Sequence, residues 1–332
     1  MIAQLDSEYN KNGFKKILRR LVSYGFFEGR PHTTKGQWFN PVVFSLLKLI
    51  NFVPGTSTLH KPIFITGLGR SGTTILGVIL SLHRDVGFLN EPKAIWRLVD
   101  PQHDINGDYV STNGKFKLSS KDVTENATLT ANRIFSRYLK LVNSSRLVDK
   151  YPELIFRVDY ILKLFPDAKI LFLTRNGCDA IHSIDLWSRR LGIQKNGVIE
   201  DWWGRDDVKW SYLRDQIINI DDTYAEIRSV ATKDLDHVNR AALEWIITMR
   251  EGLKQYSQYP NSVYQFKYED LLIYKSDVIS QILECCELSR DNTVTTYADS
   301  MLYTNSQKPY PLLNKEIDIL FRKTMHSLKY EA

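Results

Sequence analysis

A glycine-rich segment that holds a single cation offers the clearest chemistry in this sequence. Gly67-Leu-Gly-Arg-Ser-Gly-Thr-Thr follows the apolar run Pro62–Thr66 and precedes an apolar stretch with helical spacing. Between a strand and a helix, such a loop exposes backbone N–H groups at a helix N-terminus, and these bind phosphate. The glycine spacing is that of a nucleotide P-loop, but Thr73 stands where a Walker loop has lysine. The segment predicts a phosphate site with Arg70 as its cation; the alternative is an ordinary strand-turn-helix connection.

A second candidate anion site follows the most strongly predicted strand, Ala168–Thr174. Arg175 stands directly after this strand, and Ser183 lies eight residues further, in a predicted helix. A guanidinium can hold phosphate through two hydrogen bonds and a hydroxyl can add a third, so the two residues could clamp a phosphate. The alternative is an arginine paired with a surface carboxylate and a solvent-facing serine.

One carboxylate has a position from which it could act as a base. Glu91 follows the short predicted strand Val86–Leu89 and precedes Pro92, so it is a candidate proton acceptor, a surface residue or a helix cap. His83 and His103 are expected in solvent-exposed segments, outside the chemistry. No Cys or His cluster has metal-ligand spacing, so no metal site is expected.

These residues need a scaffold of alternating strands and helices. Further strands are predicted over residues 146–149 and 262–268, and helices over 73–82, 129–142, 154–165, 178–187, 237–258, 277–288 and 314–328. Residues 100–127 are polar and predict a long surface loop. The alternation predicts an α/β fold of three layers, with a mainly parallel sheet and helices on both faces.

The chain divides into an N-terminal helical and loop extension, residues 1–60, and one domain over 61–332. Residues 189–236 carry three tryptophans among many charges and are expected to form an insertion. Their rings could stack on an acceptor or belong to the core. The tryptophans are Trp202, Trp203 and Trp210.

The composition of the chain limits the classes of binding partner and the cellular compartment that we expect. The 44 basic and 38 acidic residues give a net charge of +6, too small and dispersed to predict a nucleic-acid partner but compatible with a polyanionic small molecule. No signal peptide or transmembrane segment is recognised, and three cysteines do not suggest a disulfide framework, so a cytoplasmic protein is expected. Phe14–Val22 could make a weak peripheral contact with an anionic membrane, although a solvated amphipathic helix is the preferred interpretation.

From Pro62 onward, the sequence resembles the PAPS-dependent sulfotransferases, whose donor is 3'-phosphoadenosine 5'-phosphosulfate. The family's phosphate loop runs Lys or Arg, Ser, Gly, Thr, Thr, and here it reads Arg70-Ser71-Gly72-Thr73-Thr74. The resemblance implies a P-loop-like sulfotransferase fold. It also implies that Arg70 stabilises the transferring sulfuryl group and the leaving phosphate oxygen. The residues that would hold the 5'-phosphate are Ser71, Gly72, Thr73 and Thr74.

The same resemblance assigns the remaining site residues. Arg175 and Ser183 match the family's 3'-phosphate segment, and Tyr268, in Tyr-Glu-Asp-Leu, would lie near the nucleotide. Lys150 stands where many members have a lysine before a proline and would assist Arg70. Glu91, 21 residues after Arg70, matches the glutamate base of protein-tyrosine sulfotransferases and several bacterial members.

The resulting hypothesis is in-line transfer of a sulfuryl group from PAPS to an acceptor hydroxyl, without a metal. A cell-surface glycan is the preferred acceptor, and a peptide tyrosine or a small lipid is the alternative. Two other classes stay open: a P-loop phosphotransferase, and a module that binds a nucleotide or glycan without catalysis.

Overall fold

The computed structural model describes residues 3–31, 36–53, 55, 58–109, 113–195, 197–304 and 306–331. Its centre is a sheet of five parallel strands in the order β2-β3-β1-β4-β8. The central strand β1 pairs on both sides, with Ile63 opposite Val148 of β3 and Lys169 of β4. The strands are β1 (Ile63–Gly67), β2 (Val86–Asn90), β3 (Arg146–Lys150), β4 (Lys169–Thr174) and β8 (Val263–Lys267).

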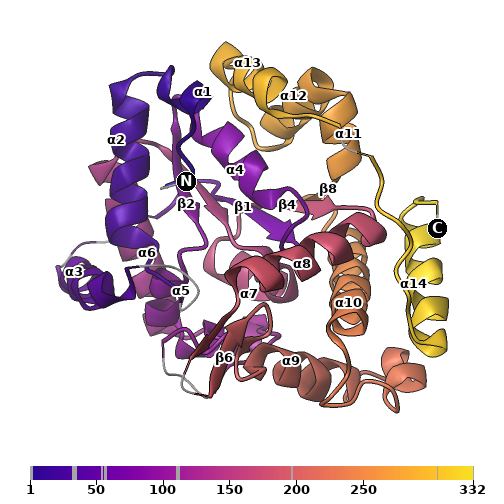
Figure 1. Cartoon of the computed structure of the whole chain (residues 1–332). Helices are drawn as coiled ribbons and strands as arrows, with labels where there is room; N and C mark the ends of the chain where they lie inside the picture. The colour runs from indigo at the N-terminus through magenta and orange to yellow at the C-terminus, as the bar shows by residue number, and fades with distance from the viewer. Residues whose placement is uncertain are drawn as a thin grey trace.

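Alternate strand residues point into two separate apolar clusters, one on each face of the sheet. Phe64 and Leu89 belong to the first cluster, whereas their neighbours Ile63, Ile65 and Phe88 belong to the second. Strands that are buried on both faces are mostly apolar, and this explains the short apolar runs of β1 and β4. The strand β3 is equally buried but also contains Arg146, Asp149 and Lys150. The predicted three-layer α/β fold is confirmed (Figure 1).

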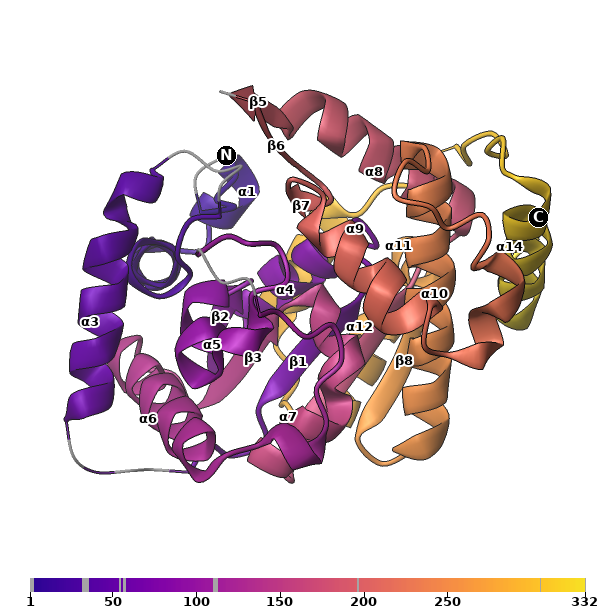
Figure 2. The same cartoon turned by 90° about the horizontal axis from the view of Figure 1, so that it is seen from below.

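Different sets of helices cover the two faces, as Figures 1 and 2 show. The second cluster is covered by α4 (Thr73–Ser81), α12 (Lys275–Cys285) and α13 (Asn292–Met301). The first cluster is covered by α5 (Lys93–Val99), α6 (Glu125–Leu141), α7 (Val158–Leu164), α8 (Gly177–Leu191) and α10 (His237–Gln258), with α14 (Lys315–Ser327) packed on α10.

The first 60 residues form helices that pack on the sheet domain. Phe27, Val43 and Leu47 from this segment are fully buried in the first cluster. The elements are α1 (Ser7–Asn10), α2 (Phe14–Val22), the π-helix η1 (Ser23–Phe27), the 3-10 turn η2 (Gln37–Phe39) and α3 (Asn40–Phe52).

Two predictions about surface segments are wrong. Residues 100–127 do not form a surface loop, because Ile105, Phe116 and Leu118 are buried in the first cluster. His83 and His103 are also fully buried rather than in exposed segments. The His83 ring hydrogen-bonds the Ser289 carbonyl at 2.9 Å. Polar composition along a segment does not reveal that its few apolar residues are inserted into a core.

The Trp-rich segment mixes core and surface. Trp203 and Trp210 are 1% and 0% exposed and contact each other with ring centroids 5.9 Å apart, so neither ring can stack on an acceptor. Trp202 is only partly buried. The segment's elements are β5 (Ile193–Lys195), β6 (Val198–Asp201) and β7 (Gly204–Arg205), which form a small antiparallel sheet, then α9 (Val208–Leu213), η6 (Arg214–Ile218) and η7 (Asp222–Ile227).

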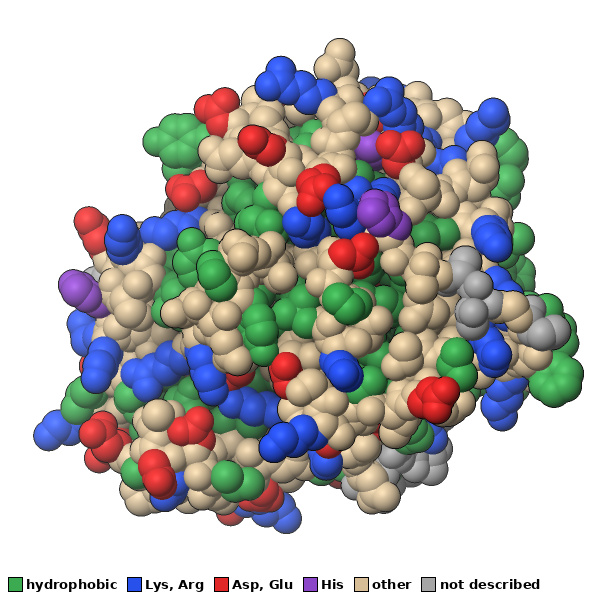
Figure 3. All heavy atoms as spheres, turned by 180° about the vertical axis from the view of Figure 1, so that it is seen from behind, with side chains coloured by type: hydrophobic (Ala, Val, Ile, Leu, Met, Phe, Trp, Pro, Cys, Tyr) green, Lys and Arg blue, Asp and Glu red, His purple; other side chains and the backbone are tan. Residues whose placement is uncertain are grey.

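On the face seen from behind, basic and acidic side chains are interspersed (Figure 3). Among the described residues, no helix is both long enough and apolar enough to cross a bilayer.

Candidate active site

All five strands of the sheet deliver a predicted site residue at the same edge. Parallel strands place their carboxyl ends together, and ligands of open α/β sheets bind at that edge. Arg70 follows β1 by three residues, and the other four end a strand or directly follow one. They are Glu91 after β2, Lys150 at the end of β3, Arg175 after β4 and Tyr268 after β8.

The glycine-rich loop has the backbone of an anion site. Gly72 lies at φ +83° as the N-cap of α4, and the ring of Tyr268 packs so closely that a Cβ on Gly72 would lie 2.1 Å from a ring carbon. Arg70 adopts φ +72°, a strained conformation for a residue with a side chain. Ser71 is fully buried and its hydroxyl has no hydrogen-bond partner among the described residues. An unpaired buried hydroxyl beside a helix N-terminus suits a phosphate oxygen.

Two arginines crowd against this loop. Arg175 Nη1 donates to the Arg70 carbonyl at 2.6 Å, and Arg70 Nε donates to Ser183 Oγ at 3.1 Å. The Arg175 guanidinium lies over the Tyr268 ring at 4.9 Å. Burial lowers the pKa of Arg70, and the neighbouring charges of Arg175 and Arg190 lower it further. The charge of Glu91 opposes this effect only in part. Cations that repel each other in this way favour an anion between them.

The structure therefore brings together the residues predicted to bind the donor. Arg70, Gly72, Arg175, Ser183 and Tyr268 are linked by direct contacts. Two loop threonines lie beside them in the first turn of α4: Thr73 is buried, whereas Thr74 lines a cleft. These residues fit a nucleotide that carries phosphates at two positions.

Glu91 lies between two lysines at the other half of the edge. Its carboxylate forms an ion pair with Lys150, which is buried, and lies 3.9 Å from the ammonium of Lys93. Burial raises the pKa of Glu91, but the charges of Lys150 and Lys93 outweigh this effect and hold it at about 2. Glu91 is therefore ionised at neutral pH, in the form that accepts a proton. Like Arg70, it adopts a left-handed conformation, with φ +51°.

A carboxylate from the N-terminal helices supports the strand that carries Glu91. Glu28 Oε1 accepts the backbone N–H of Asn90 at 2.8 Å, one residue before Glu91. Both Glu28 oxygens also bind the guanidinium of Arg20, at 2.5 and 2.9 Å, and both side chains are almost fully buried. The two-point ion pair fixes Glu28, and Glu28 fixes the end of β2.

A cleft of about 710 Å³ opens beside Arg70, Glu91 and Lys150. Its walls include residues of the N-terminal segment, the 100–127 segment and the Trp-rich segment, together with residues of α5, α8 and the segment after β3. Trp202 connects the cleft to the phosphate loop. Its ring packs so closely on Gly69 that a Cβ added to this glycine would lie 2.5 Å from a ring carbon. Other residues of the walls include Tyr24, Arg30, Asn106, Asp108, Trp187, Arg190, Arg205 and Lys209.

The cleft is polar, aromatic and largely charge-balanced. Lys93 pairs with Asp108 at 3.2 Å, and the rings of Trp187 and Trp202 contact edge to face at 5.4 Å. The amide oxygens of Asn90 and Asn106 are buried and accept no hydrogen bond among the described residues. Aromatic faces next to unsatisfied acceptors suit a ligand rich in hydroxyl groups.

Several cleft residues were not singled out from the sequence. Lys93, Glu28 and Arg30 belong to no recognisable motif, and each depends on a contact between distant segments. Only Lys93 could have been found from the sequence, because it follows the candidate base Glu91 by two residues and begins a helix.

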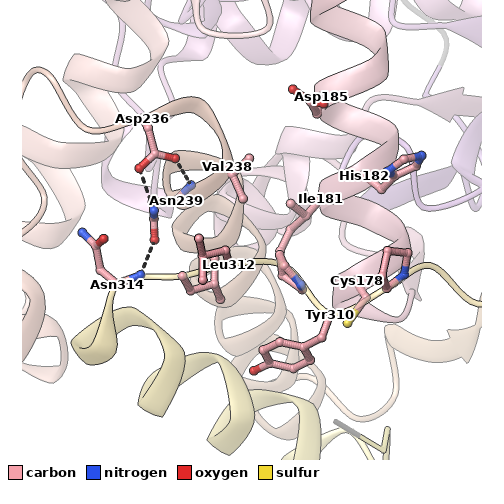
Figure 4. A pocket seen from close by; sticks show the side chains of 13 residues that line it. Cys178, Ile181, His182, Asp185, Asp236, Val238, Asn239, Tyr310, Leu312 and Asn314 are labelled. Carbon is pink, nitrogen blue, oxygen red and sulfur yellow. Dashed lines mark hydrogen bonds between the residues drawn. The ribbon is translucent and has the colours of Figure 1, made fainter.

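A second cavity, of about 680 Å³, lies between α8, the start of α10 and residues 309–314 (Figure 4). His182 and Asp185 of α8 line it, and Asn239 donates to Asp236 at 2.6 Å and accepts the Asn314 N–H at 2.9 Å. None of the predicted site residues lines this cavity. Within the described part of the chain, no group of three or more His, Cys, Asp or Glu residues could hold a metal ion.

Comparison with known proteins places this site in a family. Residues 62–216 match the model of the sulfotransferase family, a span that includes every predicted site residue except Tyr268. The chain is 30% identical over 118 residues to nodulation protein NoeE of Sinorhizobium fredii, covering 34% of this chain and 28% of that protein. It is 30% identical over 135 residues to protein-tyrosine sulfotransferase 1 of Mus musculus, covering 39% and 36%.

Among solved structures, the sulfotransferase domain of the Synechococcus PCC 7002 olefin synthase shares the fold. It superposes with a TM-score of 0.51 at 17% identity, covering 84% of this chain and 98% of that domain. The two sequence matches, by contrast, span only about a third of the relatives' own lengths. The N-terminal helices and Glu28 lie outside the family match.

Proposed function

The chain belongs to the sulfotransferase family, and on this premise we propose that it transfers a sulfuryl group from PAPS to a hydroxyl of a carbohydrate. One observation carries the proposal. Arg70, Arg175 and the Ser71 hydroxyl, which has no hydrogen-bond partner in the described part of the chain, lie at the same sheet edge as the ionised carboxylate of Glu91. A cleft that suits a ligand rich in hydroxyl groups lies beside them.

The donor would lie across Arg70, Arg175 and Tyr268. Arg175 and Ser183 would hold the 3'-phosphate, and the loop residues Ser71 to Thr74 would hold the 5'-phosphate. Their side chains and N–H groups supply fixed positive charge where a kinase uses Mg²⁺.

In the transfer step, Glu91 would take the proton of the acceptor hydroxyl. The hydroxyl oxygen forms a bond to sulfur while the bond from sulfur to the phosphate oxygen breaks, and PAP leaves with the extra negative charge. Arg70 would stabilise this charge. Lys150, which has three donor hydrogens and uses one on Glu91, would add a second cation. Because a carboxylate is a far weaker base than an alkoxide, the proton transfer should accompany sulfuryl transfer rather than precede it.

The carbohydrate assignment is supported by Trp187 and Trp202 in the cleft and by the unsatisfied amide oxygens of Asn90 and Asn106. A peptide tyrosine is the second candidate, because the chain is 30% and 31% identical to two protein-tyrosine sulfotransferases over 135 and 126 residues.

Labelled PAPS and three acceptor panels test the proposal: oligosaccharides, tyrosine peptides and lipids. We expect label on an oligosaccharide, and the transfer should survive EDTA. Label on a tyrosine peptide would replace the carbohydrate assignment. Binding of PAP without transfer to any panel would indicate a module without catalysis. Activity that is lost with EDTA and restored by Mg²⁺ would support the phosphotransferase alternative.

A further inference from the structure

The helix α2 exposes its apolar side to solvent, the reverse of an ordinary amphipathic surface helix. Its cationic side faces the protein: Lys16 donates to the carbonyls of Leu82 and His83 at 2.6 and 2.9 Å. Arg19 and Arg20 likewise bind groups of the protein. Its apolar side faces outward, with Phe14, Leu18 and Leu21 exposed by 75%, 48% and 40%. An outward apolar side has a cost in water and needs a partner that covers it.

The neighbouring helix α3 extends this apolar surface. Val42, Leu49 and Phe52 are 48%, 62% and 86% exposed, and Trp38, just before the helix, is 81% exposed. The α3 helix packs against η1, which continues α2, and the rings of Phe26 and Phe39 contact across the junction at 6.2 Å. Both helices lie at one edge of the molecule (Figure 1), and Figure 2 shows α3 outermost at that edge.

The charge of this region identifies the kind of partner. The first 84 residues hold 11 of the 44 Lys and Arg residues but only three of the 38 Asp and Glu residues. The rest of the chain therefore has more acidic than basic residues, so the whole net positive charge comes from this part. Glu28, its only acidic residue after Glu8, is 4% exposed and paired with Arg20. Several of these cations bind groups of the protein, but Lys15 of α2 and Lys48 of α3 are exposed, and neither helix contains an acidic residue. Two copies of this surface repel each other, whereas an anionic surface attracts it.

We propose that α2 and α3 dock on an anionic lipid surface, with Phe14, Leu18, Leu49 and Phe52 inserted among the lipids. Amphipathic helices bind in the plane of a bilayer interface through buried apolar area together with attraction between basic residues and anionic lipids. The exposed residues Lys15 and Lys48 lie on these helices and would contact the headgroups.

Vesicle sedimentation with the full chain tests this docking. Wild-type protein should pellet with vesicles of phosphatidylcholine and phosphatidylserine, and less with phosphatidylcholine alone or at high salt. The double variant Leu49→Glu, Phe52→Glu should bind at least roughly tenfold more weakly, because each inserted apolar side chain contributes about that factor. Ile319→Glu is the matched control: Ile319 is 56% exposed on α14, at the opposite edge, and should leave lipid binding unchanged.

Circular dichroism must show that both variants unfold at the wild-type temperature. Absence of wild-type binding to either vesicle, or equal binding by the double variant, would overturn the proposal. A wild-type dimer that becomes a monomer in the double variant, without vesicle binding, would assign the surface to a second copy of the chain instead. Because no donor or acceptor is present, the result is independent of the sulfuryl-transfer proposal.

Discussion

Replacement of Glu91 by Gln removes the proposed proton acceptor and keeps its shape. General-base catalysis contributes about 10²–10⁴-fold, so kcat for sulfuryl transfer should fall by a factor in that range. The affinity for PAP should hardly change, because the donor residues lie on β1, β4 and β8. The assay is transfer from labelled PAPS to the acceptor found by the panel screen, with PAP affinity measured separately by calorimetry.

The two lysines beside Glu91 lead to further expectations about pH dependence and stability. Its pKa of about 2 lies below the ordinary value of 4.5, so its ionised form stabilises the fold above pH 4.5, and this stabilisation is lost as the pH falls toward 2. The wild-type kcat should therefore show no acidic limb from this group above a pH of about 4. Lys150→Met removes the nearest cation and should move such a limb to higher pH. Glu91→Gln leaves the buried Lys150 without an anion and should lower the free energy of unfolding by about 1–2 kcal/mol.

The chain contains a matched control for Glu91→Gln. Glu287 also lies between two lysines, Lys61 and Lys169, which hold its pKa at about 2, and it also adopts a left-handed conformation, with φ +53°. It lies away from the carboxyl edge, near the start of β4. Glu287→Gln should keep wild-type kcat. If Glu91→Gln retains kcat within a factor of about three of wild type, the base lies elsewhere and the reasoning is refuted.

Three other perturbations separate the parts of the site. Arg175→Ala should remove most of the preference for PAP over AMP, because a hydrogen bond between charged groups contributes about 1.5–3 kcal/mol to binding. Equal binding of PAP and AMP by the wild-type protein would contradict the 3'-phosphate assignment. Trp202→Ala should raise the acceptor KM without changing the affinity for PAP, and an unchanged KM would exclude this ring from the acceptor site. Trp203→Ala, in the core, should instead lower the free energy of unfolding by about 3–5 kcal/mol. Glu28→Gln should lower kcat more than it changes PAP affinity, because Glu28 holds the Asn90 N–H beside the base; equal loss of both, measured by the same two assays, would indicate a purely structural role.

The sequence predicted the fold because its best strands, β1 and β4, are short apolar runs with clear boundaries and alternate with helical segments. β4 and the glycine-rich loop could be read directly, since their physical requirements are local: burial on both faces, and a turn that only glycine-rich backbone permits. The donor residues follow from the same logic. Once the strands are parallel, Arg70 and Arg175 must meet at one edge.

The acceptor side could not be predicted in this way, because it depends on contacts between segments far apart in sequence. Glu28 acts on Asn90 across 62 residues, and Trp202 reaches the loop at Gly69 only after the small antiparallel sheet folds back. Trp203 differs from Trp202 by one position, yet it points into the core. No periodicity distinguishes the two, since the segment forms only two- to four-residue strands there.

The strand order β2-β3-β1-β4-β8 divides the carboxyl edge into two halves. Arg70, Arg175 and Tyr268 follow β1, β4 and β8. The proposed base Glu91 and the second cation Lys150 come from β2 and β3, which lie together at one end of the sheet. The added helices before β1 pack at that same end, against β2. A change in these helices is therefore transmitted first to the end of the sheet that carries Glu91 and Lys150, at a distance of two strands from the end that carries Arg175 and Tyr268.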